Sequence, residues 1–139
     1  DPKGNPHSLM LNEGLPVRMG NSGLSLALNQ LYDIVKVEGE RGPFKVSTRE
    51  YIYALHDKNG ELVSFHYHPQ SGINFCHMHL RQHFRKVHFP TGRVAIEEVV
   101  ALAVRDLGVP HRRDDYEEVI LAGLEKFREW RTWHSRGTI

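Results

Sequence analysis

Six of the ten histidines of this chain lie between His66 and His88, and four of them form two His-x-His pairs, His66/His68 and His77/His79. Imidazoles titrate near neutral pH and are common metal ligands, so this set suits either acid–base chemistry or a transition-metal site. Alternate residues of a β-strand project to the same face. Each pair is therefore expected to place both imidazoles on one side of a sheet.

Two alternating segments that flank a turn predict a β-hairpin. Residues 45–56 (KVSTREYIYALH) and 61–68 (ELVSFHYH) lie on either side of residues 57–60, Asp-Lys-Asn-Gly, whose Asn-Gly step favours the positive φ of a tight turn. With these four residues as the loop, His56 faces Glu61. Three residues of the first strand then share the histidine face: Arg49, Tyr51 and Tyr53.

A third strand, after the turn region 69–75, is expected to bring the two pairs together. If this strand returns antiparallel with His68 opposite His77, then His66 lies opposite His79. Directly opposed Cβ atoms lie about 4.5–5.5 Å apart. Four imidazoles then form one patch on the sheet.

The first functional interpretation is metal-independent cleavage of RNA. Two of the four histidines can serve as base and acid, so the candidate catalytic residues are His66, His68, His77 and His79. Basic and aromatic groups near them can hold the phosphate and stack on bases. The candidate substrate-binding residues are Arg49, Tyr51, Tyr53, Arg81, Lys86, His88 and Arg93.

The alternative interpretation is a non-catalytic metal-binding or protein-interaction module. The same four residues, His66, His68, His77 and His79, can surround Zn or Ni as neutral imidazoles. The chain contains no HExxH or CxxC motif that would support the metal independently. Histidines are also tolerated on the half-exposed face of a sheet without any function.

Two amphipathic helices are predicted after the strands, one with an apolar stripe from Ile96 to Leu107 and one from Asp114 to Trp130. We expect both to cover the apolar face of an antiparallel sheet of about four or five strands, which makes residues 23–139 a single α+β domain. Helix and strand interpretations compete over residues 24–38. Residues 1–22 carry Pro, Gly and Asn at short intervals and are predicted to form a flexible N-terminal arm.

Composition restricts the class of protein more than its function. The 139 residues are 40% hydrophobic and 25% charged, which is typical of a globular domain, and the net charge of +1 gives no general argument for nucleic-acid binding. The single cysteine, Cys76, excludes an intramolecular disulfide and favours the cytoplasm. No apolar run approaches the roughly 20 residues of a membrane span, and no signal peptide is recognisable.

One resemblance accompanies these patterns. The hairpin, the strand that ends in His-x-His, a further strand and the run His88-Phe89-Pro90-Thr91-Gly92-Arg93 before a Glu-rich helix resemble uncharacterised small bacterial proteins and the TumE-type toxins of toxin–antitoxin pairs, over about residues 44–107. The resemblance implies an RNA-directed toxin that a partner antitoxin protein neutralises, and it points most directly to His77 and His79. The long second helix and the extra His-x-His pair depart from that pattern. With the histidine pattern, the resemblance leads us to predict a toxin-like ribonuclease. Homo-oligomerisation is possible.

Overall fold

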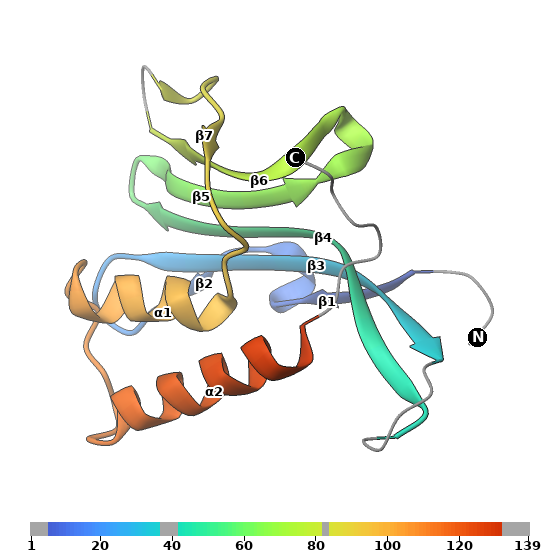
Figure 1. Ribbon diagram of the computed structural model, residues 1–139. Helices are drawn as coiled ribbons and strands as arrows, with labels where there is room; N and C mark the ends of the chain where they lie inside the picture. The colour runs from blue at the N-terminus through green and yellow to red at the C-terminus, as the bar shows by residue number, and fades with distance from the viewer. Residues whose placement is uncertain (1–5, 37–41, 82–83, 132–139) are drawn as a thin grey trace.

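The computed structural model describes residues 6–36, 42–81 and 84–131, which form an antiparallel sheet and two α-helices (Figure 1). The α+β class is therefore confirmed, but within the described residues the sheet has seven strands rather than about four or five. The strands are β1 (His7–Met10), β2 (Val17–Arg18), β3 (Ser25–Lys36), β4 (Phe44–Asp57), β5 (Gly60–His68), β6 (Ile73–Leu80) and β7 (Phe89–Pro90). The helices are α1 (Ile96–Arg105) and α2 (Tyr116–Trp130), with 3₁₀ turns at Asn12–Gly14 and Pro69–Ser71.

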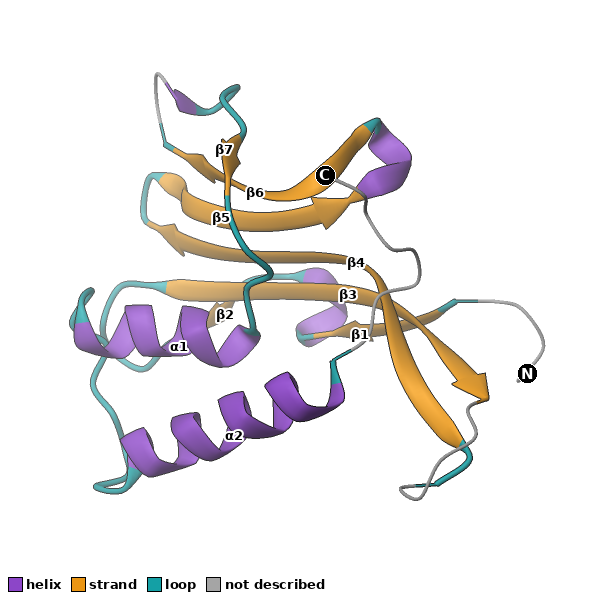
Figure 2. Ribbon diagram, in the orientation of Figure 1, coloured by secondary structure: helices purple, strands orange, loops and turns teal. Residues whose placement is uncertain are grey.

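The strands follow the order β1-β3-β4-β5-β6-β7, and β2 also pairs with β3 (Figure 2). Each of these pairings is antiparallel. Two of the additional strands, β1 and β2, come from the segment 1–22 that was predicted to be an arm. Both pair with β3, so this part of the segment extends the sheet, while residues 1–5 lie outside the described residues.

The competition between helix and strand interpretations over residues 24–38 is decided in favour of the strand β3. Leu24, Leu26 and Leu28 alternate along the chain as in a strand, and Leu26 and Leu28 are buried in the core. β3 pairs with β4 from Ser25 to Lys36. These pairings over the whole strand outweigh the local helical spacing.

The predicted β4–β5 hairpin is confirmed, with His56 opposite Glu61 as expected. A β-bulge between Leu55 and His56 then shifts the register, so Leu55 pairs with Val63. A bulge adds one residue to one strand and so reverses which side chains share a face beyond it. Every prediction about the face of β4 that was counted from the turn changes for this reason.

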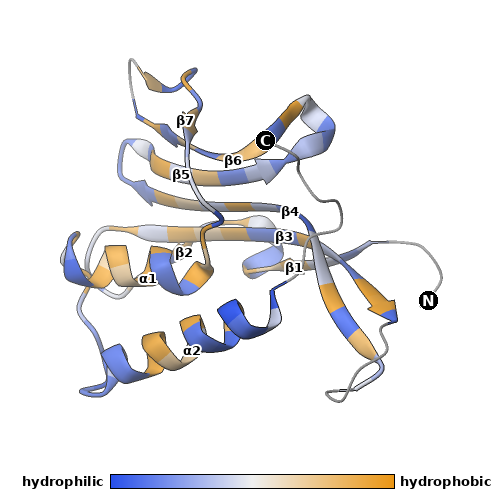
Figure 3. Ribbon diagram, viewed as in Figure 1, coloured by the Kyte–Doolittle hydropathy of each residue, from blue (hydrophilic) through white to orange (hydrophobic). Residues whose placement is uncertain are grey.

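The hydrophobic core lies between the sheet and α1. Val99 and Ala103 of α1 pack with Leu55 and Val63 of the sheet. α2 packs against α1 and contributes no buried residue, so the expectation that both helices cover the sheet holds chiefly for α1. Both helices carry apolar and polar segments (Figure 3).

The helix pair approaches closely at Gly123 of α2. A Cβ atom at this position would lie 2.8 Å from the Cγ atom of Glu97 in α1. Glycine therefore makes room for the Glu97 side chain. Neither helix has the length and hydropathy that crossing a membrane would require.

Candidate metal centre

Five histidines of β5, β6 and the segment before β7 form one contiguous group, called the histidine cluster below: His66, His68, His77, His79 and His88. The sixth, His83, lies outside the described residues. The cross-strand register brings His66 directly opposite His77 and places Ser64 opposite His79. The predicted pairing of His68 with His77 is therefore wrong by two residues. Because the error is even, the predicted single face still holds.

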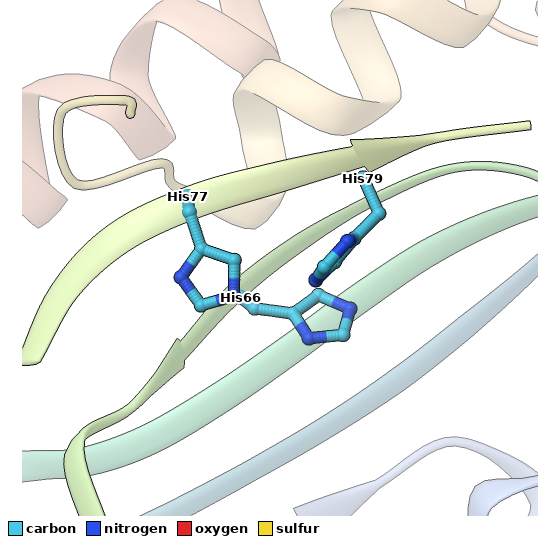
Figure 4. Close-up of side chains that lie close together, drawn as sticks. All are labelled: His66, His77 and His79. Carbon is cyan, nitrogen blue, oxygen red and sulfur yellow. The ribbon is translucent and has the colours of Figure 1, made fainter. Parts of the chain in front are cut away.

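His77 is the centre of the cluster. Its ring centroid lies 5.5 Å from that of His66, 5.0 Å from His68, 5.1 Å from His79 and 4.8 Å from His88. The rings of His66 and His79 are also 4.8 Å apart. Figure 4 shows the side chains of His77 and His79 extending from β6 toward the ring of His66.

Three of these rings can offer nitrogens to one ion. One ring nitrogen each of His66, His77 and His79 lies within 4.8 Å of the other two. His77 has no exposed surface, and the Nε2 atoms of both His66 and His77 are buried without a hydrogen-bond partner in the described structure. An unsatisfied buried polar atom is costly, so two of them in neighbouring rings require an explanation such as a bound ion.

The Nδ1 atoms of these three rings are held by hydrogen bonds. The Nδ1 atom of His77 lies 3.0 Å from the carbonyl oxygen of Phe75, and that of His79 lies 3.0 Å from the carbonyl oxygen of Arg85. The Nδ1 atom of His66 lies 3.2 Å from the Nε2 atom of His68. Each of the three rings is therefore fixed in orientation through Nδ1.

A short chain of hydrogen bonds continues from His68 to the surface. The Nδ1 atom of His68 contacts the hydroxyl of Ser71, and this hydroxyl donates to the carbonyl oxygen of His68 at 2.9 Å. Sequence reasoning missed Ser71. Its position in the turn after β5, three residues beyond His68, is the local pattern in which a serine hydroxyl bonds nearby groups.

The fold favours the neutral form of His66 and His77. Burial, and then the neighbouring imidazoles, with His79 the largest among them, lower the pKa of His66 to about 3. Burial also lowers the pKa of His77, although its hydrogen bond to the Phe75 carbonyl opposes this shift. Neutral imidazole is the form that binds metals.

Two predicted substrate-binding residues lie on the wrong face. The bulge at Leu55 turns Tyr51 and Tyr53 toward the core, where only 1% and 3% of their surface is exposed. Burial raises the pKa of both phenols above its ordinary value. Tyr51 accepts a hydrogen bond from the Val94 amide at 3.2 Å, so these tyrosines support packing under the helices rather than the histidine cluster.

Two predicted arginines are engaged in ion pairs away from the cluster. The Nε atom of Arg49 donates to a carboxylate oxygen of Asp33 at 2.6 Å. The guanidinium of Arg81 binds both carboxylate oxygens of Asp57 and the Gly60 carbonyl, and it lowers the pKa of Asp57 to about 2. Arg81 therefore ties the end of β6 to the β4–β5 turn.

The last three predicted substrate-binding residues differ in their surroundings. Arg93 lies on the helix side, where it donates to the Thr48 hydroxyl at 2.6 Å and its guanidinium carbon lies 4.8 Å from the centre of the Phe127 ring. Lys86 is exposed, as is His88. Of the seven predicted residues, His88 is the one that belongs to the histidine cluster, where its ring contacts those of His77 and His79.

A scan against protein-family models and searches of curated proteins and solved structures found no match to this chain. The resemblance to TumE-type toxins therefore stays a prediction. The function has to be argued from the site itself.

Proposed function

We propose that this protein binds a transition-metal ion through His66, His77 and His79. The observation that carries the proposal is the convergence of their three ring nitrogens within 4.8 Å, where two buried Nε2 atoms have no other partner. Three protein imidazoles with one further coordination position are an established zinc arrangement.

The hydrogen bonds support the required tautomer at His77 and His79. A carbonyl oxygen can only accept, so the Nδ1 atoms that face Phe75 and Arg85 carry the ring protons. The lone pair of each neutral ring is then on Nε2. Backbone carbonyls hold metal-binding histidines in this way in many metal sites.

The hydrogen bonds that run from Ser71 through His68 support the same tautomer at His66. The Ser71 hydroxyl donates to the His68 carbonyl, so its oxygen accepts the Nδ1 proton of His68. The Nε2 atom of His68 is then free to accept from Nδ1 of His66. This leaves the lone pair of His66 on its Nε2 atom, which is buried without a hydrogen-bond partner in the described structure, as is the Nε2 atom of His77.

The donor set indicates the kind of ion. The described group contains only imidazoles, with no carboxylate, which disfavours Mg²⁺ and Ca²⁺ and suits Zn²⁺, Ni²⁺ or Cu²⁺. Nitrogens bound to one tetrahedral zinc at about 2.0–2.1 Å lie about 3.3 Å apart. The nitrogens of the three rings, which lie within 4.8 Å of one another, would therefore approach one another by up to about 1.5 Å to bind the ion.

Calorimetric titration of chelator-treated protein with Zn²⁺ tests the proposal. We expect about one equivalent to bind and thermal stability to rise, by about 2.7 kcal/mol at a free concentration one hundred times Kd. His79→Ala should weaken binding at least tenfold, and the exposed His111→Ala is the matched control. Circular dichroism checks that both variants fold. If the parent shows no heat of binding and no stabilisation by Zn²⁺, the metal centre is excluded.

RNA cleavage is the second candidate, because His88 of the cluster and Lys86, two residues before it in the sequence, are exposed and can meet a phosphate. As a toxin-like ribonuclease the protein would act on RNA without a metal and be neutralised by an antitoxin protein. Cleavage should then survive a chelator, show a bell-shaped pH profile and fall about a hundredfold or more in His77→Ala or His79→Ala. If neither the parent nor the variants cleave RNA, this candidate is removed.

A further inference from the structure

We propose that His88 is a fourth ligand of the metal centre, which closes the coordination sphere with protein nitrogen. This inference rests on the proposed function. It changes what the centre can do, because a metal with four protein ligands has no position left for a reactive water or a substrate.

The sheet places His88 next to the three inner ligands. β7 pairs with β6 through His77 with Pro90 and Met78 with Phe89, so the next position of this register puts His88 opposite His79. The Thr91 amide donates to the Cys76 carbonyl at 2.8 Å and secures the strand just beyond this pair. His88 therefore immediately precedes a paired strand, which anchors its backbone beside β6.

The His88 ring already contacts two of the proposed ligands. Its centroid lies 4.6 Å from that of His79 and 4.8 Å from that of His77. His66 approaches the same two rings at 4.8 and 5.5 Å. An ion between His77 and His79 can therefore take His66 from one neighbouring strand and His88 from the other.

Hydrogen bonding separates His88 from His68, the other flanking histidine. Both ring nitrogens of His68 are engaged, one with Ser71 and one with His66. Within the described part of the chain the His88 ring takes part in no hydrogen bond, and the residue is exposed. His88 can thus give a nitrogen to a metal without breaking a contact, whereas His68 would have to abandon its role in orienting His66.

Cobalt-substituted protein tests the inference, because the visible absorption of Co²⁺ reports its ligands. The parent, His88→Ala and the control His111→Ala would be loaded with Co²⁺ alone and titrated with azide. We expect azide to leave the spectra of the parent and the control unchanged. In His88→Ala, which opens a position, we expect azide to change the spectrum and Co²⁺ affinity to fall by about tenfold or more.

A second measurement follows the His88 ring directly. Nitrogen NMR of the Zn²⁺-loaded parent should show a shift of one His88 ring nitrogen at the same stoichiometry as those of the inner ligands. An azide-sensitive parent, with His88→Ala binding as tightly as the parent, would overturn the fourth ligand and leave the three-histidine centre standing. Failure of the parent to bind Co²⁺ or Zn²⁺ at all would overturn both proposals.

Discussion

Acidification should destabilise the metal-free protein, because folding keeps His66 neutral. Burial lowers its folded-state pKa to about 3, whereas a histidine in an unfolded chain titrates near 6.5. Between these values the unfolded state binds more protons at this residue than the folded state. The free energy of unfolding therefore falls as the pH falls, by about 1.4 kcal/mol per pH unit.

The contribution of His66 to stability is complete above pH 6.5 or so and is lost progressively toward pH 3 or so. At about pH 5 the loss reaches up to about 2 kcal/mol from this residue. The lowered pKa of His77 acts in the same direction. Asp57, whose pKa is lowered to about 2 by Arg81, loses its contribution only below about pH 4, outside this window.

Urea unfolding in the presence of a chelator, between about pH 7.5 and pH 5, measures this loss. The variant His66→Gln has no group to titrate at this position, so its stability should fall less on acidification than that of the parent, by up to about 2 kcal/mol. The exposed control His111→Ala should keep the parental dependence. If the parent and His66→Gln lose equal stability over this range, the argument that the fold holds His66 neutral is refuted.

Further substitutions at three residues test the assignments on both sides of the sheet. His68→Leu should weaken Zn²⁺ binding about 10–100-fold in the calorimetric titration, because it removes the acceptor that orients His66. His68→Gln retains an acceptor and should recover much of the lost affinity. Tyr53→Phe removes a 2.7 Å hydrogen bond to Gln30 and should lower the free energy of unfolding in urea by about 1 kcal/mol. Its Zn²⁺ affinity should be unchanged, and a loss of affinity would contradict the placement of Tyr53 on the core face. Arg81→Ala should lower the urea midpoint because it releases the β4–β5 turn, and an unchanged midpoint would show that its ion pair adds nothing.

Local patterns were sufficient to predict the parts of the fold that depend on a single segment. The Asn-Gly turn, the two amphipathic helices and the alternation of His66 with His68 and of His77 with His79 all follow from rules that apply within one strand, turn or helix. Because parity within a strand does not depend on its partner, the shared histidine face survived an error of two residues in the pairing of β5 with β6.

The relation between strands was decided only by the tertiary structure. The bulge at Leu55 moved Tyr51 and Tyr53 from the predicted histidine face into the core, and the pairing of His66 with His77 replaced the predicted one. Alternation is a property of one chain segment, but register results from pairing energies summed along two strands and from the burial of a whole face. A single inserted residue reverses the face on which every later side chain of the strand lies, at little local cost in free energy. Composition and spacing therefore cannot predict such a bulge, which depends on the assembled sheet.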